Sequence, residues 1–170
     1  AAALETAHGA KGRVEPVPTD GDYSIFIDYA VTPDAIENVL TTLRGIAPKR
    51  LVMLFGAGGD RDRKKRPIMG KLSADIADFV IVTSDNPRTE DPMSIIEEIL
   101  PGVRAGKAPY KVICDRPEAI RWAIDHHEPG DVILLCGKGH EDYQIIGHEK
   151  IHMDEREIVA DYLAERAKRT

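Results

Sequence analysis

Short apolar runs alternate with amphipathic stretches along most of this chain. Five runs rich in β-branched and aromatic residues have the length of buried strands, at residues 23–27, 51–55, 79–82, 110–114 and 132–136. Apolar residues elsewhere recur at helical spacing, which predicts helices from residue 33, around 68–76, over 92–100 and 116–126, and from 154 to about 168. This alternation predicts an α/β, Rossmann-like fold with a mostly parallel sheet and helices on both of its faces.

The two ends of the chain depart from this alternation. After the fifth strand, residues 143–146 and 150–152 flank Gly147, and this pattern predicts an antiparallel hairpin near the C-terminus. Residues 1–20 begin with an alanine-rich stretch without methionine and continue through glycine- and proline-containing segments, a composition typical of a linker. We therefore expect one domain over residues 21–170, preceded by a linker that ends a missing part of a longer protein.

Composition and charge narrow the class of protein. A chain of 170 residues with 42% hydrophobic and 31% charged residues is typical of one globular domain. The net charge of -6 and the aromatic content of 5% argue against nucleic acid or an anionic membrane surface as a partner. No apolar run approaches the ~18 residues of a membrane span and no stretch resembles a signal peptide, so we expect a cytoplasmic protein without membrane insertion. Cys114 and Cys136 fall in apolar runs, which favours buried free thiols in a reducing compartment.

Polar clusters follow four of the predicted strands directly. They are Asp28-Tyr29, residues 56–66, residues 84–88 and residues 137–141. Parallel strands of one sheet end at the same edge, and open α/β folds bind their ligands there. The sequence therefore predicts a binding site made from these four loops.

The segment from Asp85 to Arg88 contains an acid, an amide and a guanidinium within four positions. Arg88 can hold a carboxylate through two parallel bonds, Asp85 can hold an ammonium, and Pro87 restricts the turn between them. These groups suit a receptor for a zwitterion. Asp-Asn-Pro is also ordinary turn and helix-capping chemistry, so both interpretations stay open on these residues alone.

The glycine-rich loop at residues 56–66 does not match a dinucleotide fingerprint. The third glycine of that motif would fall at position 61, which is arginine here, and the following residues are basic. Exposed backbone N–H groups with Arg61, Lys64, Lys65 and Arg66 suit a phosphate or carboxylate better. A solvated basic loop is the alternative for some of these side chains, and Arg61, nearest the strand, is the one we expect to be functional.

The last cluster, at residues 137–141, lacks the upstream glycine and the Ser or Thr of a phosphate loop around Lys138. Its glycines instead allow backbone carbonyls to approach an ammonium, with Glu141 as the countercharge. His140 is a candidate base or a structural donor. The histidines show no zinc-site spacing, and we expect no metal ligands and no catalytic triad.

Four segments together resemble the C-terminal domain of Mur ligases, and the resemblance covers essentially the whole chain. They are DYAVTPD at 28–34, FGAGGDRD at 55–62, SDNPR at 84–88 and GKGHEDYQ at 137–144. The resemblance implies an ATP-dependent amide ligase of peptidoglycan synthesis, which adds the third residue of the stem peptide. In this family ATP phosphorylates the D-glutamate side chain of a UDP-N-acetylmuramoyl dipeptide, and an incoming amine attacks the acyl phosphate.

The Asp-Asn-Pro-Arg motif of the family is similar to residues 85–88 and is associated with meso-diaminopimelate rather than L-lysine. Carried over by position, the resemblance implies an amino-acid pocket made of Arg61, Asp85, Asn86, Arg88, Gly137 and Glu141. The chemistry agrees, because diaminopimelate has a distal carboxylate that lysine lacks. A site built around a required polar group can reject the analogue without it by roughly 10⁴-fold or more.

Two features depart from the family pattern. Val31 replaces the usual histidine in the loop that resembles an ATP-contacting segment, so Asp28 is expected only to lie near the nucleotide. No Gly-x-x-Gly-Lys-Thr phosphate loop is present, so we expect ATP and Mg²⁺ to be bound mainly by a missing central ATPase domain, whose tail residues 1–20 resemble.

We therefore expect no catalytic residues in this fragment, which alone should be inactive. The alternatives are an L-lysine-adding ligase and a non-catalytic module that binds an amino acid or anion.

Overall fold

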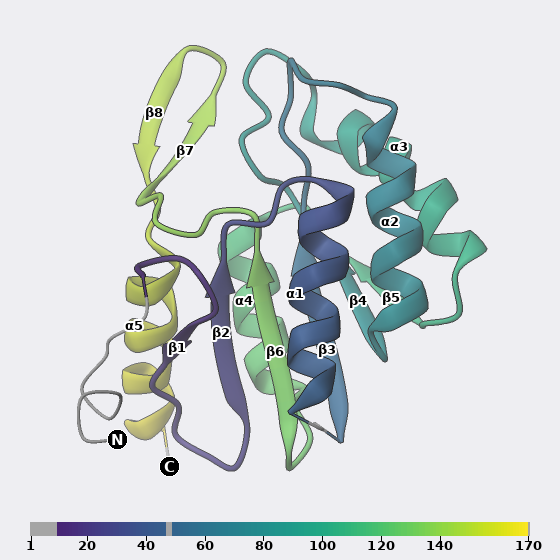
Figure 1. The fold of residues 1–170 in the computed structure, drawn as a ribbon. Helices are drawn as coiled ribbons and strands as arrows, with labels where there is room; N and C mark the ends of the chain where they lie inside the picture. The colour runs from purple at the N-terminus through teal and green to yellow at the C-terminus, as the bar shows by residue number, and fades with distance from the viewer. Residues whose placement is uncertain (1–9, 47–48, 170) are drawn as a thin grey trace.

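The computed structural model describes residues 10–46 and 49–169 of the chain. Within these ranges a six-stranded sheet, a separate two-stranded hairpin and five helices are formed (Figure 1). The strands are β1 (Glu15–Val17), β2 (Ser24–Asp28), β3 (Arg50–Phe55), β4 (Phe79–Val82), β5 (Tyr110–Val112), β6 (Asp131–Cys136), β7 (Tyr143–Ile146) and β8 (Glu149–His152). The helices are α1 (Pro33–Gly45), α2 (Lys65–Ile76), α3 (Pro92–Ala105), α4 (Arg116–Asp125) and α5 (Glu155–Ala167).

The strand order of the large sheet is β1-β2-β6-β3-β4-β5. All of its neighbours pair in parallel except β1, which runs antiparallel to β2, and β7 pairs antiparallel with β8. The predicted α/β fold, the mostly parallel sheet and the C-terminal hairpin are thus confirmed. The central strands β3 and β6 read as nearly continuous apolar runs because both of their faces are covered.

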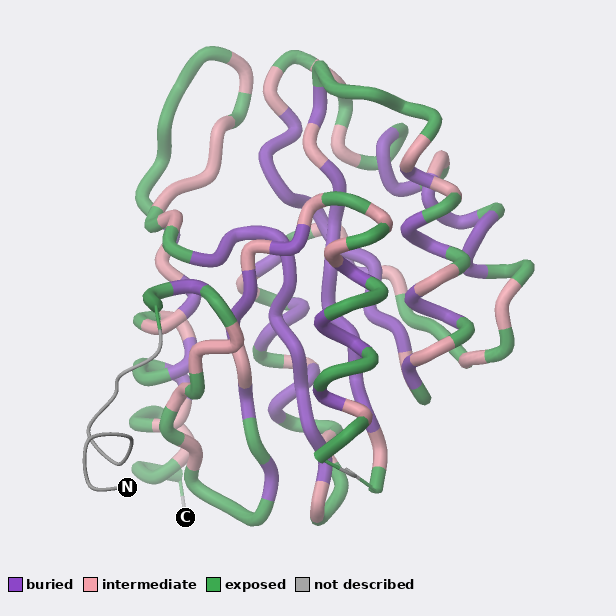
Figure 2. The backbone as a smooth tube through the Cα atoms, viewed as in Figure 1, coloured by how far each residue is buried: buried purple, intermediate pink, exposed green. Residues whose placement is uncertain are grey.

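Successive side chains of the central strands point to opposite faces and build two cores. Leu51, Met53 and Phe55 of β3 pack on the side covered by α1, α2 and α3. Val52 and Leu54 pack on the other side, against α4 and α5. In Figure 2 the buried backbone runs through the middle of the sheet, and the exposed backbone is on the outer helix faces and the hairpin. Among the described residues, no helix combines the length and apolar character needed to cross a membrane.

Local sequence explains where the helices begin. Thr32, Asp91, Asp115 and Asp154 each precede a helix and accept a hydrogen bond from a backbone N–H of its first turn. In α1, α3 and α4 a proline also lies in the first turn, where no backbone donor is needed. Helices α1, α3 and α4 therefore begin soon after β2, β4 and β5 end, at the carboxyl edge of the sheet.

The main difference from the predicted elements lies in the linker segment. Residues 15–17 form the edge strand β1, and the backbone N–H of Val14 donates to Asp28 at 2.9 Å. Residues 1–9 of the expected linker lie outside the described residues. The prolines on both sides of Val17 led to the prediction of a linker, because proline is frequent in loops, although it is also compatible with an edge strand.

Candidate functional site

The four predicted loops meet at the carboxyl ends of β2, β6, β3 and β4, which are consecutive neighbours in the sheet. They enclose a cavity of about 130 Å³. All six residues expected to form the pocket line this cavity: Arg61, Asp85, Asn86, Arg88, Gly137 and Glu141. Tyr29, Val31, Lys65 and Met69 also line it and were not assigned to the pocket from the sequence.

Asp85 brings a partly unsatisfied carboxylate into the cavity. The side chain is 6% exposed, and its Oδ1 accepts the backbone N–H of Asn86 at 2.6 Å. Its Oδ2 is buried and has no hydrogen-bond partner among the described residues. A buried acceptor without a partner costs free energy, so Oδ2 is suited to accept a hydrogen bond from a ligand ammonium.

Gly137 keeps the space in front of Asp85 open. Its φ of +116° lies in a region that residues with a side chain rarely adopt, and a Cβ at this position would come 2.7 Å from Asp85 Oδ2. The glycine therefore serves both the backbone turn after β6 and access to the carboxylate.

Arg88 has an unusual backbone and a partly available guanidinium. Its φ is +52°, its N–H donates to Ile145 O at 3.0 Å, and its carbonyl accepts the Gly147 N–H at 2.7 Å. These two bonds hold the left-handed conformation in place. Within the described residues its side chain donates to the backbone carbonyl of Gly59 at 2.8 Å, with a longer contact to Asn86 O, and pairs with no carboxylate. A ligand carboxylate can fill the remaining donor positions.

Asn86 and Glu141 form a network with Lys138. Asn86 Nδ2 donates to Glu141 Oε2 at 3.0 Å, and Asn86 Oδ1 accepts from Lys138 Nζ at 2.7 Å and from the Ile145 N–H at 2.9 Å. Lys138 Nζ also pairs with Glu141 Oε2 at 2.9 Å. Both the oxygen and the nitrogen of the Asn86 amide are therefore hydrogen-bonded within the protein. The Glu141 carboxylate is the group of this pair that can still accept a hydrogen bond from a ligand in the cavity.

The basic side chains of the loop at residues 56–66 have different roles: some lie at the cavity and others are bonded within the protein. Arg61 is exposed and lies at the cavity, and Lys65 Nζ donates to Val31 O at 3.0 Å beside it. Arg66 is fully buried, which corrects its suggested role as an anion ligand. It donates to both carboxylate oxygens of Glu90 and to Glu98, and its hydrogen bonds lower the pKa of Glu90 to about 2.

Asp28 lies outside the cavity and makes structural hydrogen bonds. Its Oδ1 accepts the Ala30 N–H at 2.8 Å, and its Oδ2 accepts the Val14 N–H at 2.9 Å. His140, the candidate base, is exposed with its ring 5.0 Å from that of Tyr29, and it does not line the cavity. Asp28 thus fixes the first loop, while the position of His140 gives no support for a catalytic role.

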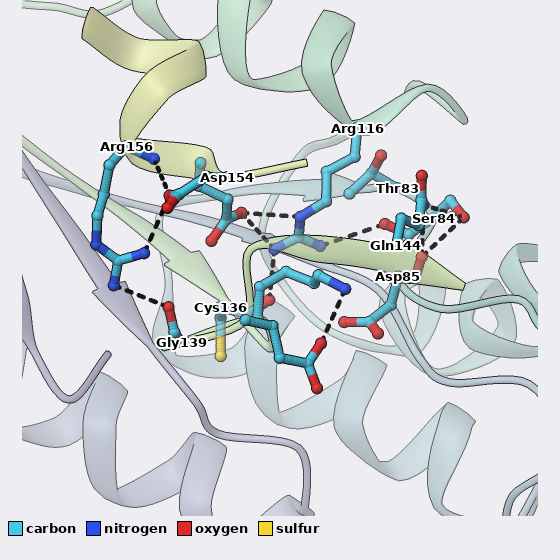
Figure 3. Close-up of polar contacts among 12 residues, drawn as sticks. Thr83, Ser84, Asp85, Arg116, Cys136, Gly139, Gln144, Asp154 and Arg156 are labelled. Carbon is cyan, nitrogen blue, oxygen red and sulfur yellow. Dashed lines mark hydrogen bonds and ion pairs between the residues drawn. The ribbon is translucent and has the colours of Figure 1, made fainter. Parts of the chain in front are cut away.

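Arg116 connects the ends of two strands, and Figure 3 shows its hydrogen bonds. Its side chain is buried, its Nε donates to Glu155 Oε1 at 2.8 Å, and its two terminal nitrogens donate to the carbonyls of Ser84 and Cys136. These bonds join the ends of β4 and β6 to the start of α5. This burial could not be predicted from the sequence, because arginine is mostly exposed in proteins.

The described residues contain no group of three or more His, Cys, Asp or Glu placed to hold a metal ion. Both cysteines are free thiols: Cys136 is buried as expected, whereas Cys114, also expected to be buried, is only half-buried. Acidic and basic side chains together line this cavity, among them Asp85, Glu141, Arg61 and Arg88.

Comparison with known sequences identifies relatives across this whole region. A family model described as "Mur ligase, glutamate ligase domain" matches residues 12–139. The UDP-N-acetylmuramoyl-L-alanyl-D-glutamate–2,6-diaminopimelate ligase of Caldanaerobacter subterraneus subsp. tengcongensis is 54% identical over 93% of this chain and 33% of its own length. The ligase of the same name from Clostridioides difficile is 47% identical over 95% of this chain and 33% of its own length. The chain thus spans about a third of the curated relatives that it matches.

Comparison with solved structures gives the same picture. A structure titled UDP-N-acetylmuramoyl-L-alanyl-D-glutamate–2,6-diaminopimelate ligase aligns with a TM-score of 0.85 at 40% identity, over 94% of this chain and 32% of that chain. A UDP-N-acetylmuramate-alanine ligase from Thermotoga maritima aligns with a TM-score of 0.64 at 22% identity, over 99% of this chain and 32% of that one. The second likeness shows the shared fold alone.

Proposed function

Because this chain belongs to the Mur ligase family, in its glutamate ligase domain, we propose that it is the C-terminal, amino-acid-receiving domain of a UDP-N-acetylmuramoyl-L-alanyl-D-glutamate–2,6-diaminopimelate ligase. The family expected from the four sequence segments is confirmed by the match. The proposed reaction is an ATP-dependent amide-bond formation of peptidoglycan synthesis in the cytoplasm. It joins the side-chain carboxylate of D-glutamate in a UDP-N-acetylmuramoyl dipeptide to an amino group of meso-diaminopimelate.

One observation carries the amino-acid-binding role. A single cavity contains a buried carboxylate oxygen without a partner, on Asp85, and a guanidinium without a carboxylate partner among the described residues, on Arg88. A zwitterionic amino acid supplies the missing partner to each group. Glu141 and Arg61 add a second acid and a second base to the same cavity. This inventory suits a ligand with two ammonium groups and two carboxylates, as meso-diaminopimelate has.

In this role, the domain binds and orients the nucleophile. Acidic side chains hold ammonium groups, Arg88 holds a carboxylate, and the fixed turn limits the directions in which the attacking amine can point. The amine attacks the acyl carbon, phosphate leaves, and an amide bond forms. Closure of the domain over the rest of the ligase would bring the amine to the acyl phosphate.

ATP and Mg²⁺ fit this chain poorly. The sequence has no phosphate loop, and no acidic cluster suited to a metal occurs among the described residues. Asp28, the residue expected near the nucleotide, has both carboxylate oxygens bonded to backbone N–H groups. We therefore assign ATP, Mg²⁺ and the UDP-linked substrate to the other two thirds of a longer ligase. The chain of 170 residues alone should form no product.

The decisive experiment is calorimetric titration of meso-diaminopimelate into the full-length ligase and its Arg88→Ala variant. We expect the variant to lose about 2–5 kcal/mol of binding free energy, because a ligand carboxylate loses its charged partner. Arg63→Ala is the matched control, since Arg63 lies in the neighbouring basic loop, pairs with Glu98 and does not line the cavity. Unchanged affinity in the Arg88 variant would refute the assigned role.

The same titration, repeated with L-lysine, and an assay of phosphate release separate the remaining alternatives. An L-lysine-adding ligase would bind L-lysine more tightly than meso-diaminopimelate, and Arg88 would then face a ligand without its distal carboxylate. A non-catalytic module would bind the amino acid but show no amino-acid-dependent release of phosphate from ATP in the full-length protein.

A further inference from the structure

Lys138 is a buried cation directly behind the amino-acid pocket. Its side chain is 0% exposed, although lysine is among the residues that are almost never fully buried without a partner. Its Nζ lies 2.7 Å from Asn86 Oδ1, 2.9 Å from Glu141 Oε2 and 5.4 Å from the centre of the Tyr143 ring. Lys138 itself does not line the cavity, so its ammonium acts on two pocket residues from the protein side.

The first of these residues is Asn86, whose amide has two chemically different ends. An ammonium and a backbone N–H can only donate hydrogen bonds. Because Lys138 Nζ and the Ile145 N–H both meet the same end of the Asn86 side chain, that end must be the carbonyl oxygen. The NH₂ group is therefore directed to the opposite side, where it donates to Glu141 Oε2 at 3.0 Å.

The second residue is Glu141, which receives donors from Lys138 and from Asn86 on the same oxygen, Oε2. The side chain is 11% exposed and lines the cavity. Two donors on one oxygen fix the rotation of the carboxylate, and they also keep a largely buried negative charge paired.

We propose that Lys138 is a positioning residue of the amino-acid pocket, whose buried ammonium sets the orientation of the Asn86 amide and of the Glu141 carboxylate. The inference rests on the proposed amino-acid-binding function. It states that Lys138 contributes to recognition of the ligand through two side chains and without contact to the ligand itself.

A purely structural role would also make Lys138 important for stability, because removing one partner of a buried ion pair leaves an uncompensated charge. A fall in the unfolding temperature alone is therefore uninformative. The two roles differ in which kinetic constant changes, and in whether the effect of removing Lys138 depends on Glu141.

The test is a double-mutant cycle in the full-length ligase with Lys138→Met, Glu141→Gln and the combined variant. Michaelis constants are measured for meso-diaminopimelate, ATP and the UDP-linked dipeptide, together with kcat and the unfolding temperature. Lys150→Met is the control, since Lys150 also lies over the Tyr143 ring, at 3.5 Å, but on the exposed strand β8, and among the described residues it forms no hydrogen bond or ion pair with Asn86 or Glu141.

We expect Lys138→Met to raise the KM for meso-diaminopimelate by about tenfold or more, and to change the other two KM values by less than about twofold. In the Glu141→Gln background the same change should have a smaller effect, because the carboxylate that Lys138 orients is absent and only its action on the Asn86 amide remains. Lys150→Met should match the wild type in all constants.

Additive effects of the two substitutions, or equal changes in all three KM values, would overturn the positioning role while leaving the proposed function intact. An unchanged KM for meso-diaminopimelate in Lys138→Met would do the same. A wild-type enzyme whose phosphate release does not depend on meso-diaminopimelate would overturn both proposals at once.

Discussion

At the scale of single residues, the pocket depends on positions where a side chain is excluded. Gly137 combines a φ of +116° with a site 2.7 Å from Asp85 Oδ2 for any added Cβ. Gly45, at the end of α1, has no atom within 4 Å of the corresponding position. The two glycines therefore form a matched pair for substitution by alanine.

We predict that Gly137→Ala lowers the free energy of unfolding by about 1–3 kcal/mol, because alanine is strained at this φ. It should also abolish measurable binding of meso-diaminopimelate, since the methyl group stands against the Asp85 carboxylate. Urea unfolding and calorimetric titration check the two effects. Gly45→Ala should be neutral or stabilising by about 0.4–1 kcal/mol and leave binding unchanged; a Gly137→Ala protein that binds normally would contradict the assigned geometry.

The Arg66–Glu90 pair gives the protein a defined acid sensitivity. Hydrogen bonds from Arg66 lower the pKa of Glu90 from 4.5 to about 2. Because the folded-state pKa is below the unfolded value, this pair stabilises the fold fully above about pH 4.5 and loses its contribution as the pH falls towards 2. The ion pair is 20% exposed on the Glu90 side, so solvent screening reduces its effect.

We predict that the free energy of unfolding falls between about pH 4.5 and pH 2, and that Glu90→Gln makes this fall shallower. Urea unfolding at a series of pH values measures both slopes. Glu98 also has a lowered pKa from Arg63 and Arg66, so part of the slope should survive in the variant. Identical slopes in the two proteins would show that Glu90 is not a source of acid sensitivity.

Residue types could be predicted from the sequence more easily than residue environments. Arg61, Asp85, Arg88, Gly137 and Glu141 were placed at one edge because each follows a strand, and they do share a cavity. The burial of three other cations, Arg66, Arg116 and Lys138, could not be predicted. A cation is buried only where several partners converge, and those partners come from distant segments that one sequence does not bring together.

At the scale of elements, the β7–β8 hairpin supports the pocket although it stands away from the main sheet (Figure 1). Strand β8 is exposed along its length, whereas β7 contacts the turn at residues 86–88. The Arg88 N–H donates to Ile145 O at 3.0 Å, and the Ile145 N–H donates to Asn86 Oδ1 at 2.9 Å. The hairpin thus holds two residues of the proposed site.

We predict that replacing residues 143–152 by two glycines leaves the main sheet folded but weakens binding of meso-diaminopimelate by about tenfold or more. The ends are close enough to join, since the Met153 N–H donates to Asp142 O at 2.9 Å. Circular dichroism and titration of the full-length ligase measure the two outcomes. Glu149→Gln, on the exposed strand, is the control. Retained affinity after removal of the hairpin would mean that the turn at residues 86–88 keeps its conformation without β7.

Element boundaries were predictable where local signals and packing agree. The starts of α1, α3 and α4 follow from a capping residue and a proline. The end of α3 does not follow, because the helix continues through Pro101 to Ala105. Close packing explains this: a Cβ on Gly102 would lie 1.8 Å from Pro67 O of α2, so the two helices touch at their backbones and tertiary contact outweighs the proline.

At the scale of the whole molecule, β6 lies in the centre of the sheet. Its Cys136 thiol can be used to detect opening of the sheet. Cys136 is fully buried, its Sγ donates to Ala30 O at 3.2 Å, and burial raises the pKa of its thiol far above the usual range. Cys114 is only half-buried, and desolvation raises the pKa of its thiol as well.

We predict that a water-soluble disulfide reagent modifies Cys114 slowly in the native protein, and Cys136 only when the sheet opens. Mass spectrometry of the labelled peptides, with Cys114→Ser as a second sample, separates the two sites. In denaturant both thiols should react at once. Rapid native labelling of Cys136 would contradict the closed sheet.

The overall class and the ligand edge of the molecule could be predicted from alternating strands and helices, but the strand order could not. The spacing of apolar runs is the same whether β6 joins the edge beside β5 or lies between β2 and β3. Only the complete packing of two cores decides this, since β6 supplies side chains to both of them.

The central place of β6 has a consequence for synthesis on the ribosome. Strands β2 and β3 follow each other in the chain but do not pair with each other. Strand β6, residues 131–136, lies between them and pairs with both. Until those residues emerge, the nascent chain has two apolar strands with open edges, and such edges are prone to pair with other chains. The loop at 137–141 emerges later still, so the proposed amino-acid pocket is among the last parts to form. The interval before β6 emerges is therefore the one in which these open strand edges are available to other chains.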